Sequence, residues 1–189
     1  MARPLSEEKR TALLSAATAL LAANGVSATT LQIAKTAGVA EGTLFRYFST
    51  KEELLNKVYL DLKIDLISYL SIDLPKDESV KAQFEHLWMR FIDWGLGSPE
   101  KYKALRYLEV SLDISETTRQ ASETISHDLQ HLLEKGFASG ALREQPIMFL
   151  WGVIQSLANV VLEGISRELD TRQEAKRLGW EALWGAISK

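Results

Sequence analysis

The residues best suited to chemistry lie close together, in a segment of 27 residues that begins at Thr29 and ends at Leu55. Hydrogen-bond donors recur there between apolar residues: Thr29, Thr30, Thr43, Arg46, Tyr47 and Lys51. Hydroxyl, guanidinium and ammonium groups of this kind bind phosphate oxygens and the edges of base pairs in duplex DNA. What they do therefore depends on the elements that present them.

The segment predicts two short helices, over residues 29–38 and 41–47, joined by a turn. Thr29 and Gln32 form a capping box, and Gly38 supplies the positive-φ residue that ends the first helix. The residues expected to pack the two helices together are Ala34, Val39, Leu44 and Phe48. This arrangement is typical of a helix-turn-helix. The alternative is an αα-hairpin with good caps and no role in binding.

In a helix-turn-helix, the N-terminal end of the second helix meets the base edges of the major groove. The residues at that end are Glu41, Gly42 and Thr43. The residues placed to meet the phosphate backbone are Arg46, Tyr47 and Lys51. Thr29 and Thr30 add hydroxyls and free amides at a helix N-terminus, which is an anion-binding position.

The composition is that of an ordinary globular protein, with 46% hydrophobic and 25% charged residues in a chain of 189. The chain has no cysteine, so a disulfide framework is excluded. We see neither a signal peptide nor an unbroken apolar run of membrane-spanning length, and expect a soluble, cytoplasmic protein without a membrane partner. Residues 1–60 carry seven Lys and Arg against five Asp and Glu, whereas the whole chain carries 22 against 25. A basic head on an acidic body suits a protein that touches phosphate with one end.

Hydrophobic periodicity predicts helices throughout the chain, so we expect an all-α fold of about nine helices. The predicted helices cover residues 6–24, 29–38, 41–47, 50–71, 80–95, 99–108, 115–137, 146–169 and 170–189. Caps and breakers set their ends, including Gly25, Pro99 and an Asp170–Gln173 capping box. The first three form the helix-turn-helix head, and the rest form a second, helical body.

Aromatic residues concentrate in that body: Tyr59, Phe84, Trp88, Phe91 and Tyr102. An aromatic stripe at helical spacing is usually core packing. The functional alternative is a cavity that stacks flat apolar or cationic molecules on its ring faces.

The last two predicted helices carry more apolar side chains than one neighbouring helix could cover. They include Leu150, Trp151, Ile154, Leu157, Val161, Leu183 and Ile187. Two such helices from each of two protomers would form a four-helix bundle across a two-fold axis, which predicts a homodimer. A buried hairpin in a monomer is the alternative.

We expect neither an enzyme nor a bound cofactor, because the chain has no Gly-rich phosphate loop, nucleophile elbow, cysteine nucleophile or HExxH motif. Glu123, His127 and His131 share one face of the predicted 115–137 helix. That face could hold a metal, but a solvated polar face is the ordinary interpretation, and we expect no metal.

Residues 6–55 resemble the TetR family of repressors, with TT, IA, AGV, GTLF-YF and KEELL all in register. The resemblance implies an Ω-shaped, all-helical homodimer with a variable ligand-binding body. It further implies that Gly42, Thr43 and Arg46 read bases, and that Thr30, Tyr47 and Lys51 contact phosphates. Two departures are Ala40, where a serine or threonine often caps the recognition helix, and Phe45, at a DNA-contact position where many members have tyrosine.

More narrowly, the chain resembles the RamR-like branch of that family, which consists of multidrug-responsive repressors. The likeness rests on MARP, on VAEGTLFRYF and on Trp88 followed by Trp94-Gly95-Leu96. It implies that Tyr59 and Trp88 stack on a ligand. Trp151 and Ile154 stand where the branch has an acidic residue and a phenylalanine in its pocket, which implies a weaker preference for cationic drugs.

The sequence thus predicts a DNA-binding domain over residues 1–50 and an effector-binding and dimerisation domain over residues 51–189. We expect a homodimeric repressor, released from a pseudo-palindromic double-stranded operator when a small hydrophobic, aromatic or cationic effector binds the body. The alternative is a DNA-binding regulator that responds to a protein partner. The predicted ligand contacts are Tyr59, Phe84, Trp88, Phe91, Tyr102, Trp151 and Ile154.

Overall fold

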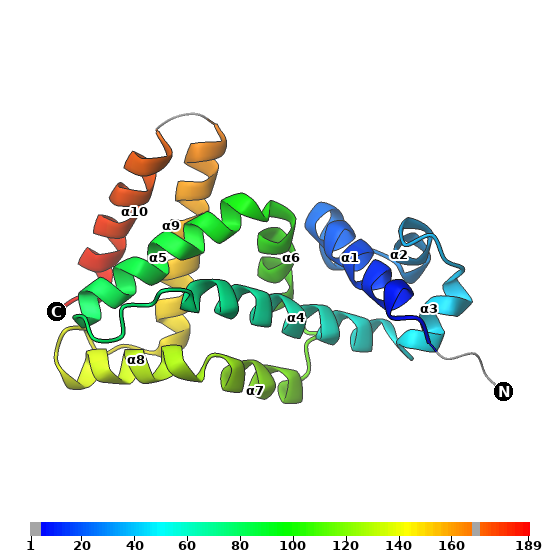
Figure 1. The fold of residues 1–189 in the computed structure, drawn as a ribbon, viewed down its shortest axis with the longest axis horizontal. Helices are drawn as coiled ribbons and strands as arrows, with labels where there is room; N and C mark the ends of the chain where they lie inside the picture. The colour runs from blue at the N-terminus through cyan, green and yellow to red at the C-terminus, as the bar shows by residue number, and fades with distance from the viewer. Residues whose placement is uncertain (1–4, 168–170) are drawn as a thin grey trace. The chain divides into compact units, whose positions relative to one another are not determined.

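A computed structural model describes residues 5–167 and 171–189, and within these ranges the fold consists of helices (Figure 1). The described residues form ten α-helices and one 3₁₀ turn, with no strand beyond an isolated bridge between Leu142 and Ser188. This confirms the predicted all-α fold of about nine helices. The MARP segment and the predicted cap Asp170 lie outside the described residues.

The elements are α1 (Glu7–Asn24), η1 (Gly25–Ser27), α2 (Thr30–Thr36), α3 (Glu41–Tyr47), α4 (Lys51–Ser71), α5 (Val80–Gly97), α6 (Pro99–Glu109), α7 (Glu116–Ile125), α8 (His127–Ala138), α9 (Ile147–Ser166) and α10 (Arg172–Ile187). The predicted single helix over residues 115–137 was wrong, because Ser126, with φ −94° and ψ 11°, separates α7 from α8. The last helix is capped by Thr171, whose side chain accepts a hydrogen bond from the Glu174 amide, one residue later than predicted.

The chain divides into two compact units. Unit 1 comprises Met1–Asp65 and Ser98–Ile125, and it contains α1–α3, most of α4, α6 and α7. In this unit α6 packs against α1. Apolar residues of both helices are buried: Leu13, Ala16, Ala17 and Leu21 on α1, with Tyr102, Leu105 and Leu108 on α6. The helix α1 therefore shares its core with a helix that begins 75 residues after α1 ends.

Unit 2 comprises Leu66–Gly97 and Ser126–Lys189, and in it α5, α9 and α10 pack against one another. Figure 1 shows α9 and α10 side by side, in orange and red. A glycine makes their contact close: a Cβ at Gly179 would lie 2.4 Å from Val161 Cγ2 and 2.6 Å from Trp88 Cζ2. Only a glycine fits there, because real Cβ atoms do not approach other atoms so closely.

Of the described helices, α9 is the one long and apolar enough to cross a membrane by length and composition alone. This is weak evidence for a membrane span, because helices of soluble proteins pass the same test. Within the protomer only 17% of its apolar window is buried. Most of α9 therefore needs another partner or lies in water.

A candidate nucleic-acid interface and a closed apolar cavity

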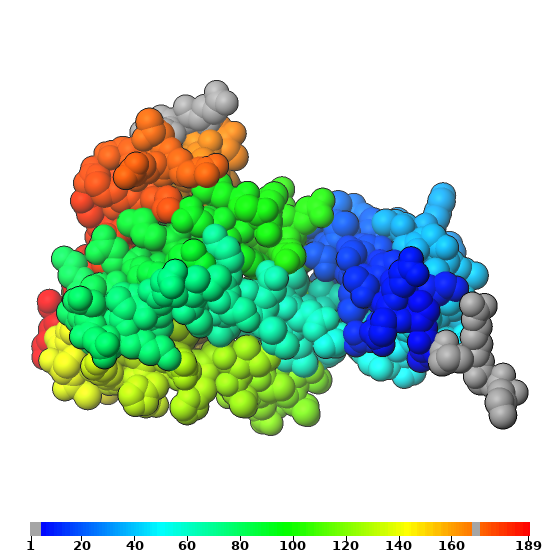
Figure 2. Space-filling view, in the orientation of Figure 1, coloured from blue at the N-terminus to red at the C-terminus, as the bar shows by residue number. Residues whose placement is uncertain are grey.

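We call the helices α1, α2 and α3 the reading head; their atoms, in shades of blue, form one contiguous group on the surface in Figure 2. The turn between α2 and α3 forms for local reasons. Thr29 accepts a hydrogen bond from the Gln32 amide at 3.2 Å, and the Gln32 side chain accepts one from the Thr29 amide at 2.9 Å. Gly38 has φ 69°, in the left-handed region that favours glycine. Leu44 is fully buried and anchors α3.

The outer side of the reading head presents most of the predicted DNA contacts. Thr29, Gly42, Phe45 and Arg46 are exposed, whereas Thr30, Glu41, Thr43, Tyr47 and Lys51 are half-buried. None of the nine side chains is in the core, so a duplex placed against α3 could reach them. Ala40 begins α3 without a side-chain cap, as the sequence indicated.

Four of these side chains make hydrogen bonds that hold the reading head together. The Thr30 hydroxyl donates to the Glu41 carboxylate at 2.6 Å, which ties the first residue of α2 to the first residue of α3. The Tyr47 hydroxyl accepts a hydrogen bond from the Ser6 amide at 2.9 Å. The Lys51 ammonium donates to the Val26 carbonyl at 2.7 Å. Each polar group is thus oriented before any duplex arrives.

The start of α4 follows the reading head and is capped by its own side chains. Thr50 Oγ1 accepts a hydrogen bond from the Glu53 amide at 3.1 Å, and the Glu53 carboxylate accepts one from the Ser49 amide at 2.7 Å. The hydrogen bonds from Ser49 lower the pKa of the Glu53 carboxyl below its ordinary value. The Glu53 carboxylate therefore keeps its role as an acceptor at the start of α4 to a lower pH than an ordinary glutamate would.

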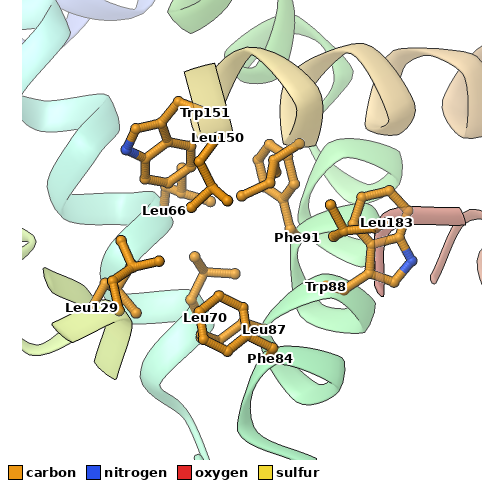
Figure 3. A pocket seen from close by; sticks show the side chains of 12 residues that line it. Leu66, Leu70, Phe84, Leu87, Trp88, Phe91, Leu129, Leu150, Trp151 and Leu183 are labelled. Atoms are coloured by element: carbon orange, nitrogen blue, oxygen red, sulfur yellow. The ribbon is translucent and has the colours of Figure 1, made fainter. Parts of the chain in front are cut away.

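Unit 2 contains a cavity of about 60 Å³ that is lined by apolar side chains from five helices (Figure 3). Its lining consists of Leu66, Leu70, Phe84, Leu87, Trp88, Phe91, Leu129, Leu133, Leu150, Trp151, Ile154 and Leu183. Five of the seven predicted ligand contacts are among them. The volume is well below the roughly 300–1,000 Å³ of ordinary small-molecule pockets. In this conformation the cavity is too small for a ligand of that size.

Trp88 is the most firmly held ring of the lining. Its indole N–H donates to the Lys176 carbonyl of α10 at 2.9 Å, and its six-membered ring lies against Gly179. Lys176 is itself paired with Asp93 at 2.8 Å. The position of Trp88 is therefore set by α10.

The other two predicted ligand contacts, Tyr59 and Tyr102, belong to unit 1 and do not line this cavity. Tyr59 is 2% exposed, and its hydroxyl donates to Glu109 at 3.2 Å. Glu109 also pairs with the nearly buried Lys63 at 2.9 Å. Burial raises the pKa of the Tyr59 phenol above its ordinary value, and the Lys63 charge opposes that effect.

Sequence reasoning missed the pair of Lys63 and Glu109. The one available signal was that Lys63 lies four residues after Tyr59, on a helix face expected to be apolar. The metal alternative gains no support: among the described residues, no group of three His, Cys, Asp or Glu could hold an ion. The break at Ser126 also removes Glu123 from the helix that carries His127 and His131.

The reading head thus presents hydrogen-bond donors on two helices that are anchored by buried apolar residues. This arrangement defines the class of protein, which is a helix-turn-helix DNA-binding protein. Residues 13–58 match the family model of the bacterial regulatory proteins, tetR family. Nearly the whole chain shares its fold with solved structures of such regulators. A protein of Shewanella sp. PV-4, described as a TetR-family transcription regulator, superposes with a TM-score of 0.83 at 25% identity. The match covers 96% of this chain and 98% of that one. A TetR-family regulator of Marinobacter aquaeolei VT8 gives 0.85 at 20% identity, covering 97% of each chain. Residues 13–58 thus carry a DNA-binding segment of the tetR-family type, and the chain as a whole shares the fold of solved TetR-family transcription regulators.

A further solved structure is similar and contains a ligand. LfrR of Mycobacterium smegmatis, a TetR-like transcriptional regulator solved in complex with proflavine, superposes with a TM-score of 0.67 at 17% identity. The match covers 96% of this chain and 98% of LfrR. At this identity the likeness concerns the fold.

Proposed function

We propose that this regulator is a homodimeric repressor in the cytoplasm, released from its operator when a small hydrophobic effector opens the cavity of unit 2. The observation that carries the proposal is a small cavity lined entirely by apolar side chains, in a protein that also carries a helix-turn-helix. The reading head, within residues 1–50, binds DNA, and residues 51–189 bind the effector and the second protomer.

In the DNA complex, each dimer places its two α3 helices in successive major grooves, about 34–36 Å apart, on a pseudo-palindromic site. Gly42, Thr43 and Arg46 face bases. Tyr47 and Lys51 face phosphates, and Thr30, whose hydroxyl hydrogen goes to Glu41, faces a phosphate with its backbone amide at the start of α2. The Tyr47 hydroxyl accepts from Ser6, so its own hydrogen is available for a phosphate oxygen.

Replacing Tyr47 with alanine should weaken binding to every duplex alike, because phosphate contacts carry no sequence information. Replacing Thr43 with alanine should instead change the sequence preference. Fluorescence anisotropy on a panel of duplexes at fixed salt separates the two effects. Wild-type binding by both variants would contradict the assigned roles.

The second protomer covers the outer face of α9 and α10. Large apolar side chains are exposed there: Met148 is 81% exposed, Phe149 61%, Val160 66% and Leu178 45%. A Cβ added at Gly152, Gly164 or Gly185 would meet no described atom within 4 Å, so nothing described in the protomer requires these helical glycines. Small residues beside exposed apolar side chains allow a second pair of helices to approach closely.

Sedimentation velocity tests this interface with two matched variants. Val160→Asp should yield monomers, because it places a carboxylate in a dry helix contact. Val110→Asp alters a valine that is 81% exposed on unit 1, and it should remain dimeric. A dimeric Val160→Asp variant would contradict the proposed interface.

The effector is a flat and largely apolar molecule. Its stacking surfaces would be the rings of Phe84, Trp88, Phe91 and Trp151, and the wall is built from Leu, Ile, Phe and Trp side chains, which carry no charge to attract a cation. LfrR, which shares the fold, was solved with proflavine, a flat aromatic molecule. Tyr59 and Tyr102 would contribute indirectly from unit 1, by stabilising the packing of the body's helices in that unit.

Tryptophan fluorescence tests the effector site with acridine, which is uncharged at neutral pH, and with cationic proflavine. We expect saturable quenching, stronger for acridine, that is reduced in Trp88→Phe, where Trp151 still lines the cavity, and retained in Trp184→Phe, a ring outside the cavity lining. Acridine should also release the operator from wild type and not from Trp88→Phe. An absence of quenching by either compound would instead favour a regulator controlled by a protein partner.

A further inference from the structure

Two large apolar side chains of the reading head lie in water. Leu31 on α2 is 60% exposed and Phe45 on α3 is 45% exposed. The same two helices bury Ile33, Ala34 and Leu44 almost completely. The internal packing of the helix-turn-helix is thus complete without Leu31 and Phe45, and their exposure calls for a different explanation.

Both side chains lie beside the hydrogen bond that joins α2 to α3. Leu31 follows Thr30, whose hydroxyl donates to Glu41 at 2.6 Å. Phe45 lies four residues after Glu41, which places it one turn along the same face of α3. Gly42 lies three residues before Phe45 and is therefore its neighbour on the helix surface, and a Cβ at Gly42 would meet no described atom within 4 Å. A groove surface can therefore approach the Phe45 ring over the glycine.

The duplex offers one apolar group in the major groove, the C5-methyl group of thymine. The other groups of the groove are polar donors and acceptors, and phosphates would gain nothing from a leucine or a phenyl ring. We propose that Leu31 and Phe45 contact thymine methyl groups, so that each operator half-site is selected in part by thymines at the positions these side chains reach. This inference rests on the proposed operator binding by α3 and names the chemistry that reads part of the site.

A uracil scan tests the proposal, because deoxyuridine differs from thymidine only by the missing methyl group. The full-length protein first selects its binding sites from a pool of random duplexes. Each thymine of the selected site is then replaced by deoxyuridine, and affinity is measured by fluorescence anisotropy at fixed salt. For at least one thymine in each half-site we expect about a fourfold loss, the factor that burial of one methyl-sized group provides.

Two variants connect the methyl groups to the protein. In Phe45→Ala or Leu31→Ala the uracil effect should disappear at the thymine that the missing side chain contacted, while the effects of other base changes remain. Both residues are exposed, so far-UV circular dichroism should match wild type. Should Phe45→Ala bind too weakly to measure, Phe45→Leu serves instead and should reduce the effect.

The outcomes separate this inference from the function on which it rests. A pool without any enriched sequence would defeat operator binding itself. An enriched site at which no uracil substitution changes affinity overturns the reading of thymine methyl groups and leaves operator binding intact. Uracil effects that persist unchanged in both variants overturn it as well.

Discussion

Replacing Gly42 with alanine should increase the stability of the reading head and weaken its binding to DNA. Gly42 is the second residue of α3, and a Cβ built there meets no described atom within 4 Å. Alanine should therefore fit the protomer without strain. Because glycine loses more conformational freedom than alanine in a helix, the free energy of unfolding should rise by up to about 1 kcal/mol.

The same methyl group would project toward the duplex in the proposed complex. An extra methyl in a close-packed interface typically costs about 1–3 kcal/mol. Operator affinity should therefore fall between roughly fivefold and 150-fold. A substitution that stabilises the protein while weakening its binding shows that the glycine serves the partner rather than the fold.

Gly38→Ala is the matched control in the same reading head. A Cβ at Gly38 also meets open space, but its φ of 69° strains any residue that carries a side chain. Alanine there should cost about 1–2 kcal/mol of stability. Because Gly38 lies before α3, the folded protein should bind the operator like wild type. The Gly42 substitution should thus weaken DNA binding without a loss of stability, whereas the Gly38 substitution should lower stability without weakening DNA binding.

Urea denaturation followed by circular dichroism measures the first quantity, and anisotropy on the selected duplex at 25 °C and fixed salt measures the second. Undiminished operator binding by Gly42→Ala would refute the close approach of DNA at that position. A loss of stability in Gly42→Ala would refute the claim that the protomer has room for the methyl group.

Three further outcomes are expected. Gly179→Ala should lower the free energy of unfolding by about 1–3 kcal/mol, because the added methyl group would overlap Trp88. Gly97→Ala, whose methyl group would meet no described atom within 4 Å, should change the free energy of unfolding little, and urea denaturation compares the two variants. Burial raises the pKa of the Tyr59 phenol above its ordinary value of about 10, so at high pH the folded state keeps a proton that the unfolded chain loses. The stability that Tyr59 contributes should be fully present below about pH 10 and fall as pH rises further, so urea denaturation should show a smaller loss of stability above pH 10 in Tyr59→Phe. Leu133→Ala should cost about 2–5 kcal/mol, measured by urea denaturation, and should tighten the binding of acridine by enlarging the cavity, measured by quenching titration.

The helix-turn-helix could be predicted closely because its boundaries are set by neighbours in the sequence. The Thr29–Gln32 box and Gly38 each act within four residues, and both work in the structure as predicted. The predicted bounds of α3, Glu41–Tyr47, were confirmed. Signals of this kind need no knowledge of the rest of the fold.

The body could be predicted less well because its contacts join distant segments. The break at Ser126 carries neither glycine nor proline, so periodicity alone extended one helix across it. Tyr59 and Phe84 both belong to aromatic spacings, but one lies in unit 1 beside Glu109 and the other lines the cavity of unit 2. No local pattern assigns a ring to one unit or the other.

The small volume of the cavity determines how strongly an effector could shift the conformational equilibrium of the protein. A ligand shifts a conformational equilibrium only by its difference in affinity for the two states. A flat ligand that does not fit a cavity of about 60 Å³ binds only those protein molecules in which the cavity wall has opened. The difference in ligand affinity between the two states therefore follows from the packing of the wall. The need for the wall to open also lowers the apparent affinity of the protein for the effector. If roughly 1% of the protein molecules were open, this affinity would fall about a hundredfold. Because Trp88 is held by the Lys176 carbonyl and Gly179, the opening should come from the other side chains of the wall, while the indole that stacks on the effector remains fixed to α10.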